Sequence, residues 1–157
     1  MAKGQIAVLD LVVSVVVFLI VMTGFFIAWN SYNNRLDDSL LSNEMSLHAF
    51  QIMQQLITTP GVPGNWENNV SSLKFIGLAY SDRIIDEAKL DSLNTINYND
   101  LKNKMNIKRF EVFILVKQGN QAVYEIGNTT KGKTIHIERG VMYKNEPSTI
   151  QVALSKK

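Results

Sequence analysis

The feature that most constrains this chain is a nearly unbroken apolar run from Leu11 to Trp29, LVVSVVVFLIVMTGFFIAW. As a single α-helix, about 19 residues at about 1.5 Å each would span about 28 Å, enough to cross the hydrocarbon core of a bilayer. Valine is abundant in the run and is a poor helix former in water. In lipid, however, the backbone must satisfy its own hydrogen bonds. The run therefore predicts a transmembrane helix.

Polar and small residues share one line along this predicted helix. Counted by helical angle, the residues within about 40° of that line are Asp10, Ser14, Val17, Val21, Gly24 and Ala28. A carboxylate near hydrocarbon depth is costly, so Asp10 is expected to have a partner or a function. Gly24 and Ala28 form a small-xxx-small pair that lets two helices approach closely. These residues predict helix–helix contacts; the alternative is a plain membrane anchor with Asp10 among the headgroups.

The helical pattern continues beyond the membrane segment, because residues 30–58 contain neither proline nor glycine and Pro60 and Gly61 follow them. Its apolar residues fall into two stripes. One stripe consists of Tyr32, Leu36, Leu40, Leu47, Phe50 and Ile57, and the other of Leu41, Met45, Ala49, Ile52 and Leu56. A helix that packs on one domain needs only one stripe. We therefore expect the globular part of the chain to cover the first stripe, and Leu41, Met45, Ile52 and Leu56 to contact other subunits. The competing expectation is a sheet that covers both.

Composition limits the remaining functions. About 100 residues remain beyond the helix, enough for one small domain. A net charge of +2 without a Lys/Arg cluster does not favour nucleic-acid binding. The absence of cysteine excludes disulfides, thiolate metal sites and cysteine nucleophiles. Lys3 before the apolar run, against Asp37 and Asp38 after it, predicts a cytoplasmic N-terminus and an external domain.

The region 60–157 contains helical and strand patterns in succession. Residues 84–93 have helical spacing, and Asn99 is expected to cap a second short helix that ends near Met105. From Lys108 onward the apolar period becomes two, which predicts strands. The predicted strands are 109–117, 122–126, 134–139 and 150–154. They form an antiparallel meander whose apolar face needs a cover, and the long helix can provide it.

The first ten residues, with KGQIAVLD before the apolar run, resemble the class III, prepilin-type signal sequence of archaeal type IV pilin-like proteins. The resemblance implies that a prepilin peptidase cleaves between Gly4 and Gln5 and that the helix then enters a filament core. It also implies that Asp10 pairs with the new amino terminus of a neighbouring subunit. Asp10 is the sixth residue after this cut, whereas many prepilins have glutamate at the fifth. The segments TPGVPGNWE, GLA and AKLDSL are also similar to archaeal pilin-like sequences.

Other motifs are weighed against simpler explanations. Residues 127–134, GNTTKGKT, match the P-loop pattern, but the alternating TIHIER that follows predicts a strand where a P-loop needs a helix. We therefore expect a glycine-rich turn and no nucleotide. His48 and His136 have no second ligand at a suitable spacing, so no metal site is expected. Asn69 and Asn128 begin glycosylation sequons.

These expectations combine into an α+β fold, in which a long N-terminal helix, transmembrane and then amphipathic, packs on a small antiparallel β-meander, as in type IV pilins. The expected parts are a leader, 1–4; a transmembrane and filament-core helix, 5–29; the extracellular part of that helix, 30–59; and a globular antiparallel-sheet domain, 60–157. The helix is expected to make this a single-pass membrane protein before assembly and a cell-surface filament subunit after it.

The expected function is that of a structural subunit, major or minor, without enzymatic activity or cofactor. Its expected partners are copies of itself or other pilin-like subunits, the prepilin peptidase, and the membrane through residues 11–29. The alternative is a membrane-anchored extracellular binding or adhesion domain that does not polymerise. An anchored enzyme ranks third, because no catalytic constellation is found.

Overall fold

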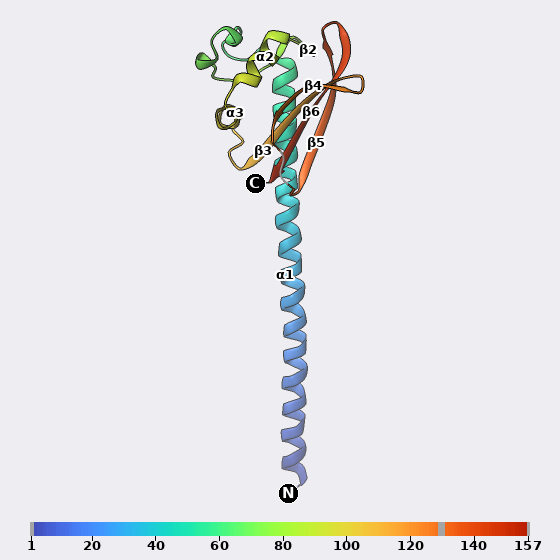
Figure 1. The fold of residues 1–157 in the computed structure, drawn as a ribbon. Helices are drawn as coiled ribbons and strands as arrows, with labels where there is room; N and C mark the ends of the chain where they lie inside the picture. Colours follow the sequence, from blue (N-terminus) through green and yellow to red (C-terminus); the bar gives the residue numbers. More distant parts are fainter. Residues whose placement is uncertain (1, 129–130, 157) are drawn as a thin grey trace. The chain divides into compact units, whose positions relative to one another are not determined.

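The computed structural model describes residues 2–128 and 131–156, with side chains from Leu9 onward. Helix α1 (Ala2–Thr58) ends two residues before Pro60 (Figure 1). The chain divides into two compact units, the first ending at Leu41 and the second beginning at Ser42. Each unit is described separately below.

The first unit is the apolar part of α1. Within the described residues, α1 is the one helix long and apolar enough to cross a membrane, and none of its most apolar window is buried. From Leu11 to Trp29 its large apolar side chains are 37–66% exposed. The Thr23 hydroxyl donates a hydrogen bond to the Leu19 carbonyl at 2.7 Å, so this polar group is satisfied within the helix. The predicted helix is confirmed, and its surface is that of a candidate membrane span.

The second unit combines the end of α1 with two short helices and a six-stranded sheet. The helical elements are the 3-10 turns η1 (Trp66–Asn68) and η2 (Val70–Ser72) and the helices α2 (Glu87–Thr95) and α3 (Tyr98–Lys104). The strands are β1 (Ala79–Ser81), β2 (Ile84–Ile85), β3 (Phe110–Gln118), β4 (Gln121–Gly127), β5 (Thr134–Tyr143) and β6 (Glu146–Lys156). The fold class is therefore α+β, as predicted.

The helix boundaries differ slightly from the sequence-based expectation. The predicted helix at 84–93 begins only at Glu87, because Ile84 and Ile85 join the sheet as β2. The Asp86 side chain caps α2 by accepting a hydrogen bond from the Ala88 N–H at 2.9 Å. Helix α3 is capped by Asn97, whose side chain accepts from the Asn99 N–H. The cap predicted at Asn99 is therefore wrong by two residues.

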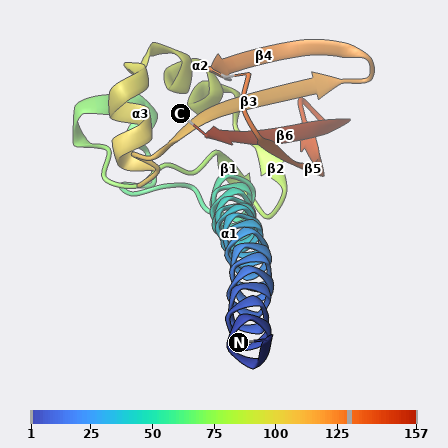
Figure 2. The ribbon, with the colours of Figure 1, turned by 90° about the horizontal axis from the view of Figure 1, so that it is seen from below.

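The sheet is antiparallel except where β2 pairs with β5, and its order is β1-β2-β5-β6-β3-β4. Figure 2 shows β4, β3, β6 and β5 side by side. The predicted meander is wrong, because the last strand β6 lies between β5 and β3. Residues Val152, Ala153, Leu154 and Ser155 are all buried, so β6 is covered on both faces, as suits a central strand.

The core of the second unit forms where α1 packs against the inner face of the sheet. The helix contributes Met45, Ala49, Ile52, Met53, Leu56 and Ile57, each at most 3% exposed. The facing strand residues are Val112, Ile114, Val116, Ile150, Val152 and Leu154, all 0% exposed. The predicted cover of the sheet by α1 is confirmed.

The residues that make this contact come mainly from the stripe expected to face other subunits; of the stripe expected in the core, Ile57 is buried. Met45, Ile52 and Leu56 were predicted to face other subunits, but they are 0%, 3% and 0% exposed. Leu41 is half-buried. Leu47 and Phe50, expected in the core, are 64% and 44% exposed. Helical spacing identifies two stripes but not the partner of each; the small Ala49 within the buried stripe lets the sheet approach the helix closely.

Candidate functional site

The main candidate interaction surface is the side of α1 whose large apolar side chains are exposed. In the second unit this side presents Leu47 and Phe50. In the first unit Tyr32, Leu36 and Leu40 are 59%, 42% and 65% exposed. We call these five residues the exposed stripe and treat the two units separately. Large exposed apolar side chains at helical spacing mark interaction surfaces more often than isolated ones do.

The residues predicted to support helix–helix contacts lie in the first unit. Asp10, Ser14, Gly24 and Ala28 are all exposed. A side chain added at Gly24 would meet no atom within 4 Å, and the helix is hollowed there between Val16, Leu19, Ile20, Thr23 and Ile27. The helix surface is therefore open for close approach by another helix. The side chains of the predicted cleavage site, Gly4 and Gln5, lie outside those that the structure describes.

A shallow pocket in the second unit lies between α1 and the start of β3. It is lined by Glu44, His48, Asn106, Ile107, Lys108, Arg109 and Phe110. The Arg109 guanidinium lies 3.2 Å from the Glu44 carboxylate, and the His48 and Phe110 ring centroids are 5.9 Å apart. Among the described residues, no group of three His, Asp or Glu side chains lies close enough together to hold a metal ion. The pocket joins α1 to β3 by ring packing and an exposed ion pair.

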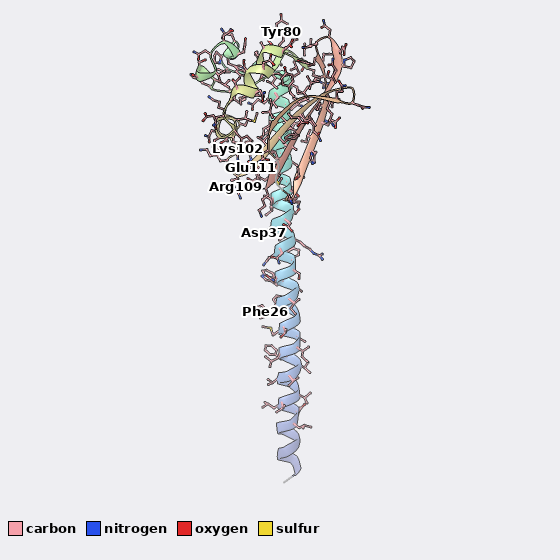
Figure 3. The ribbon with its side chains drawn as sticks, in the orientation of Figure 1. Phe26, Asp37, Tyr80, Lys102, Arg109 and Glu111 are labelled. Atoms are coloured by element: carbon pink, nitrogen blue, oxygen red, sulfur yellow. The ribbon has the colours of Figure 1, made fainter. Side chains whose placement is uncertain are left out.

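A cluster of buried polar groups joins α3 to β3, and sequence reasoning did not identify it. The Lys102 Nζ lies 2.9 Å from Glu111 Oε1, and the Tyr98 hydroxyl donates to Glu111 Oε2 at 2.5 Å. Figure 3 labels Lys102 and Glu111 in the second unit. Both are buried, at 7% and 8% exposed. The Tyr98 hydroxyl also accepts from the Val112 N–H at 3.1 Å. With its charges paired and its hydroxyl both donating and accepting, the cluster holds the fold and offers no free catalytic group.

The cluster changes the acidity of Tyr98. Burial, followed by the hydrogen bond to Glu111, raises the pKa of the Tyr98 hydroxyl to about 12. Because the folded pKa lies above the ordinary value of 10.0, the protonated phenol is favoured in the fold. Its contribution to stability is complete below about pH 10 and is lost as the pH rises through about 12.

We expect the difference in phenolate absorbance between the wild type and Tyr98→Phe to titrate near pH 12. The reason is that the substitution removes the phenol that is partly buried and donates a hydrogen bond to Glu111. An alkaline titration followed by near-ultraviolet absorbance measures this difference. A difference curve centred near pH 10, the value for a free tyrosine, would show that the Tyr98–Glu111 contact is absent in solution.

Two further buried or polar contacts fix the loops around α1. The Lys89 ammonium, 3% exposed, donates to the Pro60 carbonyl at 2.9 Å. The buried Trp66 indole donates to the Gly77 carbonyl at 3.0 Å. An added Cβ at Gly77 would lie 2.2 Å from the Thr59 carbonyl oxygen, so the backbone packs closely there. These contacts are structural and secure the segment that follows α1.

The segment that matches the P-loop pattern does not have P-loop surroundings. Strand β5 begins at Thr134, where a P-loop requires the start of a helix. Gly127 has a φ of +103°, and a Cβ there would lie 2.1 Å from the Val112 carbonyl oxygen. This glycine is therefore required by the contact between β4 and β3. Thr129 and Thr130 lie outside the described residues.

The predicted sequons begin at exposed residues. Asn69 follows η1, and its side chain and that of Ser71 are both exposed. Asn128 is exposed too, and its N–H donates to the Val112 carbonyl at 2.8 Å. The side chains are thus accessible to a modifying enzyme, but Thr130 of the second sequon lies outside the described residues.

Comparison with known proteins identifies no relative of this chain. No protein-family model matches the chain, and no curated protein or solved structure is significantly similar to it. The likeness of the first ten residues to prepilins remains a resemblance. Function must be inferred from the residues and their geometry.

Proposed function

We propose that this protein is a structural subunit, major or minor, of an archaeal type IV pilus-like extracellular filament. It assembles through α1 after its leader is removed. The observation that carries the proposal is the exposed stripe, which continues after the end of the apolar run at Trp29. About 20 apolar residues suffice to cross a bilayer, and Leu11–Trp29 already supplies that length.

The exposed stripe is costly for a domain that is merely anchored. Full burial of each large apolar side chain contributes about 1.5–3 kcal/mol, and a solitary domain would leave Leu47 64% and Phe50 44% exposed to water. A filament subunit buries such side chains against its neighbours. Tyr32, Leu36 and Leu40 of the first unit have the same property. A second copy, or another subunit with a similar helix, is therefore the partner we propose for both sets.

The polar and small residues of the apolar segment fit the same mechanism. Asp10 is a carboxylate at the start of a long apolar run, and pairing it with the amine of a neighbouring subunit's Gln5 would offset the cost of its desolvation. Ser14, Gly24 and Ala28 would let a neighbouring helix approach closely. Assembly would then move the segment from lipid into a protein core, with the second unit outside the cell.

The anchored binding domain is the competing function, and the two differ in the processing of the N-terminus and in the fate of the exposed stripe. An anchor needs neither leader removal nor a partner for Leu47 and Phe50. Both differences can be measured on the full chain.

We expect the mature protein to begin at Gln5, and Gly4→Leu to leave the leader attached. The physical reason is that a peptidase that accepts glycine before the cut has little room for a larger side chain. Mass spectrometry of the N-terminal peptide of surface-exposed protein measures this directly. Ala2→Leu, two residues upstream of Gly4, is the control and should be processed normally. A surface-exposed protein that retains residues 1–4 would contradict the proposed function.

A further inference from the structure

Strand β5 has an edge that is open over most of its length. It pairs with β6 from Thr134 to Tyr143, but on its other side β2 pairs with it only at Met142 and Tyr143. Among the described residues no other strand pairs with β5. His136, Glu138, Arg139 and Gly140 are exposed, and a Cβ at Gly140 would meet nothing within 4 Å. The edge from Thr134 to Gly140 therefore presents unpaired backbone groups to solvent.

The direction of these backbone groups follows from one hydrogen bond. The Met142 N–H donates to the Arg83 carbonyl at 2.7 Å, so it points away from β6. Directions alternate along an antiparallel strand, so the N–H groups of His136, Glu138 and Gly140 also point outward. Ile135 and Ile137, opposite Leu154 and Val152, point their side chains to the inner face of the sheet.

The opposite edge of the sheet, strand β4, is open as well. β4 pairs only with β3 among the described strands. The Asn128 N–H donates to the Val112 carbonyl, toward β3, so the N–H groups of Glu125 and Gly127 point away from the sheet. Tyr124 and Ile126, opposite Val116 and Ile114, carry their side chains on the inner face. Each copy thus carries two complementary open edges, the unpaired part of β5 and the whole of β4.

We propose that the β5 edge binds the β4 edge of a second copy, so that the two sheets continue into one another. Strands alternate in direction in the order β5-β6-β3-β4, so β4 of a copy in the same orientation runs antiparallel to β5. The contact is heterologous and repeats from copy to copy. It rests on the proposed function only in taking the partner to be a second copy.

In one register the apolar side chains of both strands share the inner face, the outward N–H groups of the two edges meet, and no like charges lie opposite each other. This register places Glu125 of one copy opposite His136 of the other, with both N–H groups directed into the contact. Ile126 then lies opposite Ile135, and Tyr124 opposite Ile137, on the inner face. A shift of two residues one way would place Glu125 opposite Glu138, and the other way would place Ile126 opposite Lys133. Like charges or a lysine beside an apolar residue disfavour both shifts.

Cysteine cross-linking of the purified full-length chain in detergent tests the register. The natural sequence has no cysteine, so Glu125→Cys with His136→Cys introduces the only pair. In the proposed contact their Cα atoms lie about 5.5 Å apart, within disulfide range. Within one chain, β6 and β3 separate the two strands, about 14 Å apart at about 4.8 Å per strand. Oxidation should therefore give a ladder of dimers, trimers and larger species, all joined between chains.

The matched control is Glu125→Cys with Gly140→Cys, which also places both cysteines on exposed edge residues. In the proposed register Gly140 lies four residues, about 13 Å, from the residue opposite Glu125, so the control should stay largely monomeric. A second control adds Glu138→Pro to the first pair. The Glu138 N–H points away from β6, so proline removes no bond of the sheet, while it should abolish the ladder. Glu138→Ala should leave the ladder intact.

The outcomes separate this inference from the proposed function. No ladder, an equal ladder from both cysteine pairs, or a ladder that survives Glu138→Pro in a folded protein would overturn the edge contact. Folding is checked by near-ultraviolet circular dichroism. Filaments that assemble from a chain without the edge contact would leave the proposed function standing. A specific ladder from a chain that forms no filaments would support the edge contact and contradict the proposed function.

Discussion

Replacing Met45 and Ile52 with lysine should unfold the second unit, whereas replacing Leu47 and Phe50 with lysine should leave it folded and block assembly. The two double variants add the same charges to the same helix. They differ in which face of α1 they change, because Met45 and Ile52 lie in the core and Leu47 and Phe50 are exposed.

The expected sizes follow from burial. Truncating a buried methionine or isoleucine to alanine costs about 2–5 kcal/mol, so two such losses amount to about 4–10 kcal/mol. Lysine in the same place adds the desolvation of a charge. A typical domain has about 5–15 kcal/mol of stability in total, so the core variant should lose its cooperative unfolding transition. Surface substitutions usually stay within about 0.5 kcal/mol.

Thermal unfolding of the full chain in detergent, followed by near-ultraviolet circular dichroism, measures the first effect. Electron microscopy of filaments on expressing cells measures the second. A Leu47→Lys/Phe50→Lys protein that folds and still assembles would remove the main support for polymerisation. A Met45→Lys/Ile52→Lys protein as stable as the wild type would instead show that the Met45 and Ile52 face of α1 does not pack against the sheet.

Much of the fold could be predicted because its signals are local. The apolar length of residues 11–29, the absence of helix breakers before Pro60 and the period of two after Lys108 each depend on neighbouring residues. Strand β3, predicted at 109–117, is found at Phe110–Gln118. The division of roles between the two stripes of α1 is not local. Both stripes are apolar and have helical spacing, and only the position of the sheet decides between them.

The strand order and the buried ion pair also depend on contacts between residues far apart in the sequence, so local patterns could not predict them. Residues 150–154 do not by themselves identify β5 and β3 as the neighbours of β6. The successive apolar residues Val152, Ala153 and Leu154 were nevertheless a signal for a central strand. Lys102 and Glu111 lie on different elements, so no periodicity relates them. A carboxylate in an otherwise apolar strand was the available hint, since such a residue needs a buried partner.

Lys102→Met should therefore destabilise the second unit strongly, although it replaces a charged side chain with an apolar one of similar length. The change leaves the Glu111 carboxylate 8% exposed without its cation, which lies 2.9 Å away in the native protein. Removing one partner of a buried ion pair costs about 3–5 kcal/mol. For a domain of this size the loss corresponds to a fall in Tm on the order of 10–20 °C.

The exposed ion pair between Arg109 and Glu44 provides the control. Its side chains are 74% and 37% exposed, and such pairs contribute about 0–1 kcal/mol, so Arg109→Met should change the Tm little. The double variant Lys102→Met/Glu111→Gln should recover part of the loss, because it removes the buried charge that has lost Lys102, while the introduced amide oxygen can still accept a hydrogen bond from Tyr98. Equal effects of Lys102→Met and Arg109→Met would show that the Lys102–Glu111 pair is solvated. In that case the cluster would not secure α3 to β3, and the desolvation that raises the pKa of Tyr98 would be absent too.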